Sequence, residues 1–287
     1  MLSEQKEKDI ISAAARIRAT IIEMLVAAGS GHTAGPLGMA DIFAALYFHI
    51  LHHDPSNPSL TDRDRLILSN GHIVPVRYAA MAHAGYFPVA ECLTLRKFGS
   101  RLQGHPERAR LPGLETTSGP LGSGLSQAAG YAYAARIDAP PKGAFRTYCL
   151  MSDGEQDAGN TWEAAMFAAN NKLSNLTAII DRNNIQIDGM TEQVMPLESL
   201  RAKYEAFNWH VLEVDGHNIR AVVDAVDEAK AIFEKPTVII AHTIPGKGVS
   251  EIEFNYEWHG KAPNKEESQR FLAELRTLQG AIMSEHQ

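Results

Sequence analysis

Four apolar segments in the second half of the chain alternate with longer segments of helical periodicity. The segments that we predict as strands cover 147–152, 176–181, 209–214 and 237–244. The segments that we predict as helices cover 121–136, 158–172, 197–207, 218–234 and 265–281. This alternation favours an α/β fold, because each helix carries the chain back to the start of the next parallel strand. The strands are apolar on both faces, as a mostly parallel sheet with helices on both faces requires.

The first half of the chain is predicted to extend the same fold. Apolar residues at three- and four-residue steps predict a helix over 4–28, which ends at the glycine-rich stretch 29–38. We further predict helices at 39–52 and 73–85, a short buried strand within 62–70 and a long loop at 99–120. Loops of that length in compact domains are usually functional. Because no internal repeat or linker interrupts the sequence, we assign residues 1–287 to a single domain.

Composition excludes several classes of protein. The chain carries 27 Lys and Arg against 34 Asp and Glu, a net charge of −7, so it has no general attraction for nucleic acid or for an anionic membrane. No apolar run approaches the roughly 20 residues that span a bilayer, and the charged N-terminus lacks the apolar core of a signal peptide. Cys92 and Cys149 form neither a disulfide framework nor a metal-ligand spacing. We therefore expect a cytoplasmic protein.

Polar residues follow the predicted strands directly. Asp153 and Gly154 come after the strand at 147–152, and Asn183 comes after the strand at 176–181. Ligands of open α/β sheets bind beyond the carboxyl ends of strands, so these residues are expected at one rim. Carboxylate and amide oxygens suit Mg²⁺ or Ca²⁺, and Mg²⁺ completes its coordination with water and phosphate oxygens. The alternative is that they are ordinary turn residues, since Asp, Asn and Gly dominate turns.

A second glycine-rich segment, 118–130, opens a predicted helix. Gly122 and Gly124 have the spacing of a dinucleotide-binding turn, but Gln127 stands where that motif has Gly or Ala, and the segment follows a loop rather than a strand. The sequence therefore gives little support to a nicotinamide-dependent dehydrogenase. The structural alternative is a turn before a closely packed helix.

The chain has 12 histidines, and several follow glycine directly. The Gly-His pairs end at His32, His72, His105 and His217. His32, His72 and His105, together with His259, lie in turns rich in Gly or Pro, from which imidazoles reach clefts and transfer protons near neutral pH. Each one alone is more often a surface histidine, but together they indicate a shared site.

Taken together, these motifs resemble those of the transketolases, which are thiamine diphosphate enzymes. They occur in transketolase order: SGHTAGPLGMADI, DRLILSNGH, GHPE, LPGLETTSGPLGSGLS, SDG, DRNNIQIDG, TIPGKGV and WHGKAP. The resemblance runs from about residue 8 to about residue 270 and is greatest to the N-terminal, diphosphate-binding subunit of a split, two-gene transketolase. It implies the thiamine diphosphate-binding fold. Each motif is moderately specific, but all of them in this order are highly specific.

The resemblance assigns roles to individual residues. Asp153 and Asn183 match the metal ligands, with Ile185 supplying a backbone carbonyl, and the implied cofactors are thiamine diphosphate and Mg²⁺ (or Ca²⁺). The other cofactor-binding positions are Gly119, Leu121, Gly154, Asn183, His72 and His259. The catalytic histidines of the family match His32, His72, His105 and His259, of which His105 is linked to binding of a donor hydroxyl group.

The family transfers a two-carbon glycolaldehyde unit from a ketose phosphate to an aldose phosphate, a reaction of the pentose phosphate pathway. The glutamate that activates the cofactor lies on a separate pyrimidine-binding module, so we expect this chain to be active only with a partner that corresponds to the C-terminal transketolase subunit. A heterotetramer of two such pairs, with self-association of this chain, is the implied assembly. The alternatives are a related ketol transferase with another acceptor and a noncatalytic cofactor-binding subunit.

Three departures from the family pattern bear on these expectations. Ser152 replaces the first glycine of a Gly-Asp-Gly motif, which a small residue tolerates. Ala158 stands where the family usually has a glutamate that links paired active sites, whereas Glu163 is retained. The residues that recognise sugar phosphates lie mostly in modules outside this sequence, so it does not specify the substrate.

Overall fold

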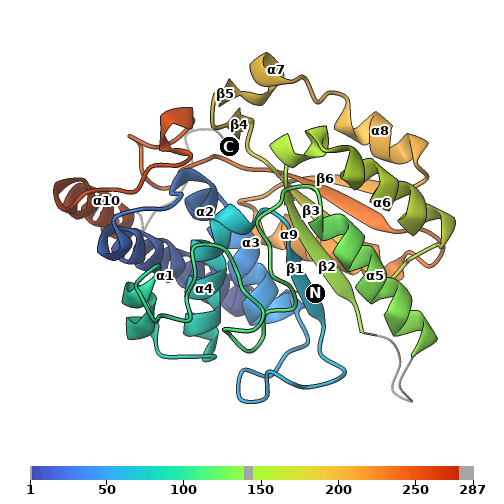
Figure 1. Cartoon of the computed structure of the whole chain (residues 1–287), viewed down its shortest axis with the longest axis horizontal. Helices are drawn as coiled ribbons and strands as arrows, with labels where there is room; N and C mark the ends of the chain where they lie inside the picture. Colours follow the sequence, from blue (N-terminus) through green and yellow to red (C-terminus); the bar gives the residue numbers. More distant parts are fainter. Residues whose placement is uncertain (1, 139–144, 278–287) are drawn as a thin grey trace.

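Five parallel strands form the centre of the molecule. The computed structural model describes residues 2–138 and 145–277. The strands are β1 (Arg65–Leu68), β2 (Thr147–Ser152), β3 (Leu176–Arg182), β6 (His210–Asp215) and β7 (Thr237–His242). They pair in the order β1-β2-β3-β7-β6, and every pairing is parallel (Figure 1). All residues of β2 and β3 are buried, as strands covered on both faces should be. The predicted α/β fold with a mostly parallel sheet is confirmed.

Helices cover both faces of this sheet (Figure 1). One apolar cluster joins the sheet to α1 (Glu4–Ala28), α3 (Ala40–Ala45), α4 (Val74–Ala84), α9 (Ile219–Ala231) and α10 (Lys265–Thr277). A second cluster joins the opposite face to α5 (Gly124–Ile137), α6 (Gly159–Asn170) and α8 (Leu200–Ala206). Neighbouring strand residues divide between the clusters: Leu66 and Leu68 face the first, whereas Ile67 faces the second.

The N-terminal helix forms where its periodicity predicts it. Ser3 caps the helix by accepting a hydrogen bond from the N–H of Lys6, and Gly29 ends it with a φ of 67°. The apolar stripe, for example Ile10, Ile17 and Ile21, is completely buried. This long helix therefore anchors the first half of the chain to the sheet.

The glycine-rich stretch after this helix differs from the prediction, because it contains the helix α2 (Ala34–Gly38). All five residues of α2 are buried, and two of its glycines make close contacts: a Cβ at Gly35 would lie 2.8 Å from Ile73 Cγ2, and one at Gly38 would lie 2.9 Å from the carbonyl oxygen of Ile244. Burial thus overrides the low helix propensity of glycine and proline. The helix predicted at 39–52 is shorter in the structure: α3 ends at Ala45 and passes directly into the π-helix η1 (Leu46–Ile50).

Several short elements were not predicted, because pairs and single turns leave no periodic signal. These are β4 (Ile185–Gln186), β5 (Gly189–Met190), α7 (Thr191–Val194) and the 3-10 helices η2 (Gly71–Ile73), η3 (Val89–Thr94), η4 (Gly154–Asp157) and η5 (Tyr256–Trp258). The segment 99–120 has neither helix nor strand, as predicted.

The remaining predictions concern the ends and the surface. Residues 278–281 of the last predicted helix lie outside the described residues, and the single-domain assignment over 1–287 stays a prediction. Within 2–138 and 145–277, no helix has both the length and the apolar content needed to cross a bilayer. Cys92 and Cys149 are buried and unpaired.

Candidate active site

A cavity of about 330 Å³ opens beyond the carboxyl ends of β2 and β3. Most of the predicted site residues line it: His32, His72, His105, Gly119, Leu121, Gly154, Asn183, Ile185 and His259. Asp153 does not line the cavity but lies directly behind Gly154 and is completely buried. The structure therefore brings together residues that stand up to 227 positions apart, His32 and His259 being the most distant (259 − 32 = 227).

Three of the histidines form a compact group within this cavity. The ring centroids of His32 and His72 are 4.9 Å apart, those of His72 and His259 are 5.2 Å apart, and those of His32 and His259 are 5.5 Å apart. His32 follows α1, His72 lies in η2 just after β1, and His259 follows η5. The structure thus places the four histidines of the Gly- or Pro-rich turns, His32, His72, His105 and His259, in one cavity, whereas His217 of the fourth Gly-His pair lies elsewhere.

The electrostatic environment keeps these imidazoles neutral. Burial lowers the pKa of His32 to about 4, with further contributions from His259, Arg96 and His105. Burial and the neighbouring histidines lower the pKa of His72 well below its usual value, and burial lowers the pKa of His259. A neutral imidazole has one donor and one acceptor nitrogen, so each ring is able both to donate and to accept a hydrogen bond near pH 7.

The carboxylate of Asp153 is held by three donors. Its Oδ1 accepts a hydrogen bond of 2.7 Å from the N–H of Gly154, and its Oδ2 accepts bonds of 2.7 Å from the N–H of Asn184 and 3.2 Å from Arg182 Nη1. Burial raises the pKa of Asp153 to about 6, against the opposing effects of these donors. A carboxylate oxygen can accept more than one bond, so this arrangement still leaves lone pairs for a cation.

Asn183 has a fixed side-chain orientation beside this carboxylate. Its Nδ2 donates to Asp181 Oδ2 over 2.8 Å, which identifies the other atom as the oxygen, and that oxygen accepts from the N–H of Ile185 over 3.1 Å. Asn184 adopts a φ of 64°, the left-handed conformation that Asn tolerates, and turns the chain from β3 into β4. Asp153 and Asn183 therefore meet at the ends of two paired strands, as the sequence predicted.

These residues fit a metal-bound diphosphate. Asp153, Asn183 and a main-chain carbonyl at Ile185 form a hard, all-oxygen donor set suited to Mg²⁺ or Ca²⁺. The described residues contain no group of three or more His, Cys, Asp or Glu able to hold a metal. A Cβ at Gly154 would lie 3.0 Å from the Gln186 side chain, so glycine keeps this wall of the cavity open. His32 Nδ1 is buried without a hydrogen bond to any described residue, as expected of an atom that pairs with a ligand.

The sequence did not reveal the role of Glu155, which also lines the cavity. Its buried carboxylate accepts hydrogen bonds from Ser69 Oγ at the end of β1, from the N–H of Gly122 over 3.3 Å and from the N–H of Ser152 over 3.0 Å. Ser69 Oγ in turn accepts from the N–H of Gly124 over 3.0 Å. Glu155 thus fixes the loop that carries Gly119 and Leu121. Only its position after Asp-Gly could have drawn attention to it.

A comparison with protein families decides the family to which this chain belongs. Residues 8–278 match the model described as "Transketolase, thiamine diphosphate binding domain". The chain belongs to the transketolase family. Its thiamine diphosphate cofactor follows from this membership, whereas the metal and the individual site residues remain predictions.

The chain is similar to two curated transketolase subunits over nearly their whole length. It is 42% identical over 274 residues to the 6-deoxy-6-sulfo-D-fructose transketolase subunit SqwG of Clostridium sp. (strain MSTE9), covering 96% of this chain and 98% of that subunit. It is 41% identical over 258 residues to one of the subunits of the apulose-4-phosphate transketolase of Phocaeicola vulgatus, covering 90% of each. The resemblance to an N-terminal subunit of a split transketolase is therefore confirmed.

Solved transketolases extend beyond this chain. The transketolase from Leishmania mexicana is 34% identical, with a TM-score of 0.87 over 93% of this chain, but only 41% of that enzyme is matched. The expected fold and the assignment to transketolase enzymes are both confirmed by this likeness.

Proposed function

We propose that this chain is the diphosphate-binding subunit of a two-component transketolase. It holds thiamine diphosphate and Mg²⁺ (or Ca²⁺) through Asp153, Asn183 and the carbonyl of Ile185, with Gly154 beside the diphosphate and the loop of Gly119 and Leu121 beside the cofactor rings. The bound cofactor supplies an electron sink for the cleavage of a ketose. The observation that carries the proposal is that one cavity gathers four histidines in front of the Asp153–Asn183 pair.

The histidines serve the sugar in this proposal. The neutral imidazoles of His32, His72 and His259 lie within 5.5 Å of each other by ring centroid, close enough to act on one substrate. They hydrogen-bond the substrate oxygens where negative charge develops, and they move protons between these oxygens and water. His105, on the same wall, binds a hydroxyl group of the donor.

The assembly requires a second subunit. Relatives matched over 90–98% of their length are named as transketolase subunits, whereas the matched Leishmania enzyme is more than twice as long as the part that matches. We therefore propose a separate partner that carries the pyrimidine-binding module and its glutamate, a cytoplasmic complex, and a heterotetramer with contacts between copies of this chain.

The substrate of this protein is proposed to be a ketose with a terminal anionic group. The two relatives at 41–42% identity are named for 6-deoxy-6-sulfo-D-fructose and apulose-4-phosphate, while the Leishmania transketolase is 34% identical. This difference favours a ketol transferase for an uncommon sugar as the second candidate function. A panel of phosphorylated and sulfonated ketose donors, each with several aldose acceptors, separates this candidate from a pentose phosphate transketolase.

Reconstitution tests the proposed function. The chain and its partner are purified separately, and glycolaldehyde transfer is measured for each alone and for the mixture. We expect activity in the mixture only, and its loss with Asp153→Ala. Transfer by this chain alone would disprove the split site. An inactive mixture that still binds thiamine diphosphate would favour the noncatalytic alternative.

A further inference from the structure

A second cavity, of about 460 Å³, opens beyond the carboxyl ends of β6 and β7. It shares no lining residue with the first cavity. It contains two sequence features that the proposed function leaves without a role: His217 of the fourth Gly-His pair and Lys247 of the segment Pro-Gly-Lys-Gly at 245–248. The second cavity therefore requires an explanation of its own.

Lys247 is the unusual residue of this cavity. It lines the cavity, only 6% of the residue is exposed, and its ammonium group forms no hydrogen bond or ion pair with any residue in the described ranges. Lysine residues with so little exposed surface are normally paired. The loop around it is fixed, since the N–H of Gly246 donates to the carbonyl of Ala34 over 2.8 Å and that of Lys247 donates to the carbonyl of Ile244 over 3.2 Å.

The first turn of α9 lies in the same cavity wall. Asn218 caps this 13-residue helix by accepting from the N–H of Ala221 over 3.0 Å, which leaves the N–H groups of Ile219 and Arg220 without an acceptor inside the helix. These groups and the helix dipole favour an anion. The loop before the helix is tied to the loop of Lys247, because His217 Nε2 accepts a hydrogen bond of 2.8 Å from the N–H of Ile244.

Two of the three described acidic side chains that line this cavity form ion pairs, and the third, Asp215, is bonded to the main chain. Asp41 accepts two hydrogen bonds from the guanidinium of Arg18, at 2.5 and 3.1 Å, and one of 2.8 Å from His217 Nδ1. Glu7 forms an ion pair with Arg220. Asp215 accepts a hydrogen bond of 2.8 Å from the N–H of His217.

Outside the cavity wall, Glu213 pairs with the lining residue His242. Among the described charges that face this cavity, Lys247 is the cation that the protein leaves unpaired.

From this arrangement we infer that the second cavity binds a phosphate group. The ammonium of Lys247 supplies the charge, and the N–H group of the lining residue Ile219 supplies a directional donor. The volume exceeds that of free phosphate, so the ligand class extends to small phosphate esters, whose hydroxyl groups reach Asp215. This site is separate from the cofactor site and does not depend on the proposed function.

Titration calorimetry tests the inference on the full chain saturated with thiamine diphosphate and Mg²⁺. The probes are inorganic phosphate and glycerol 3-phosphate, which has no carbonyl to occupy the transketolase site. We expect Lys247→Met to weaken binding by about tenfold or more, because a charge-assisted contact is lost. The matched control is Lys235→Met, an exposed lysine just after α9, which should bind as the wild type does. Equal binding by Lys247→Met, or no binding by the wild type, would overturn the inference.

Two further variants make the result unambiguous. Asn218→Asp keeps a good helix cap and therefore the fold, but it places a negative charge beside the phosphate, so binding should weaken even if Lys247→Met fails to fold. Asp153→Asn should leave this binding unchanged while it abolishes activity of the reconstituted enzyme, which separates a failure of this site from a failure of the proposed function. Tighter binding of glycerol 3-phosphate than of phosphate would identify an ester as the ligand.

Discussion

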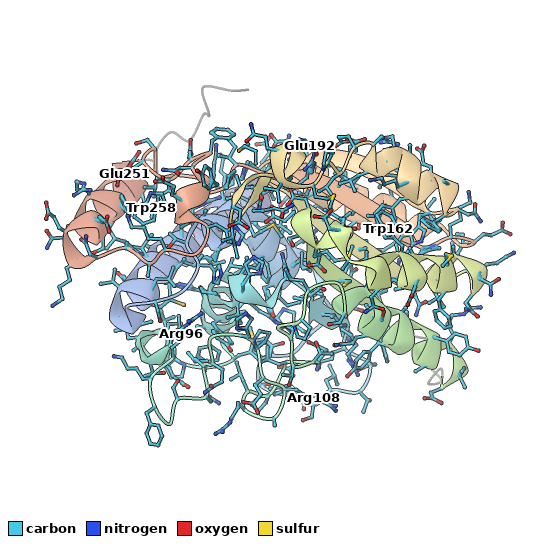
Figure 2. All side chains as sticks on the ribbon, turned by 45° about the horizontal axis from the view of Figure 1, so that its top comes forward. Arg96, Arg108, Trp162, Glu192, Glu251 and Trp258 are labelled. Carbon is cyan, nitrogen blue, oxygen red and sulfur yellow. The ribbon has the colours of Figure 1, made fainter. Side chains whose placement is uncertain are left out.

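Arg182 Nη1 lies 3.2 Å from Asp153 Oδ2, and both side chains are almost completely buried. The same guanidinium donates to Thr191 over 2.9 Å, to Glu192 over 2.7 Å and to Glu198 over 2.8 Å. One buried arginine therefore connects the proposed metal ligand to the segment that contains α7, where Figure 2 labels Glu192.

Replacement of Arg182 by Met should lower the free energy of unfolding by about 3–5 kcal/mol, because Asp153 would remain buried without its charged partner. Denaturation in urea measures the change. Arg201→Met is the control, since Arg201 is 42% exposed and its ion pairs with Glu205 and Glu213 should contribute less than about 1 kcal/mol. Similar losses in both variants would contradict the role given to Arg182.

The loop that carries Gly119 and Leu121 should depend on Glu155. Replacement of Glu155 by Ala removes the acceptor for Ser69, Gly122 and Ser152, and each buried donor left unpaired costs about 1–3 kcal/mol. We expect a lower unfolding free energy and weaker binding of thiamine diphosphate, both measured on the full chain. Glu163→Ala, at an exposed position of α6, should change neither quantity. Normal cofactor affinity in Glu155→Ala would show that the loop is held by other contacts.

The contribution of the buried histidines to stability should fall as the pH is lowered from about 6.5 to about 4, whereas the buried carboxyl groups of Asp153 and Asp181, with pKa values raised to about 6 and about 7, act in the opposite direction. Burial lowers the pKa of His32 to about 4 in the folded chain, while the unfolded chain titrates near 6.5. Between these values the unfolded state binds more protons, so acid favours unfolding. His72 and His259 act in the same direction. Urea midpoints at pH 7, 5.5 and 4.5 measure the effect. Relative to the wild type, His32→Gln should lose less stability between pH 7 and 4.5, whereas His52→Gln, with a side chain 61% exposed, should follow the wild type.

Arg96 should control the titration of the neighbouring histidines. Its guanidinium packs over Gly104, where a Cβ would lie 2.8 Å from Arg96 Nε, and its charge lowers the pKa values of His32 and His105 beyond the larger effect of burial. Arg96→Gln should therefore raise both pKa values, as NMR titration of the imidazole signals would measure. Arg108→Gln, at another exposed arginine labelled in Figure 2, is the control. Unchanged values in Arg96→Gln would rule out this electrostatic effect.

The regular part of the fold was predictable because its signal is local. The strand at 147–152 was predicted with its observed bounds, since an apolar run covered on both faces has a plain beginning and end. The meeting of Asp153 and Asn183 followed from the general rule on carboxyl ends of strands. The order of the strands did not follow, because β7 inserts between β3 and β6 through long-range pairing that no local pattern records.

The unpredicted features are those that depend on tertiary contacts. The helix α2 exists because its residues are buried, although Gly and Pro disfavour a helix. Arg182 stands within the motif DRNNIQIDG and Glu155 directly after Asp-Gly, but neither position reveals the partners on which its importance depends, such as Ser69 for Glu155. A single sequence shows which residues carry chemistry more readily than which residues hold them in place.

The insertion of β7 between β3 and β6 also affects which parts of such a protein can change in evolution independently of each other. The first cavity is built at the ends of β2 and β3, the second at the ends of β7 and β6, and they have no lining residue in common. Substitutions in the edge strand β6 and in α9 change the second cavity without changing Asp153 or the histidines of the first cavity. Selection can thus alter what the cavity beside β6 and β7 binds while the chemistry of the cavity beside β2 and β3 is preserved.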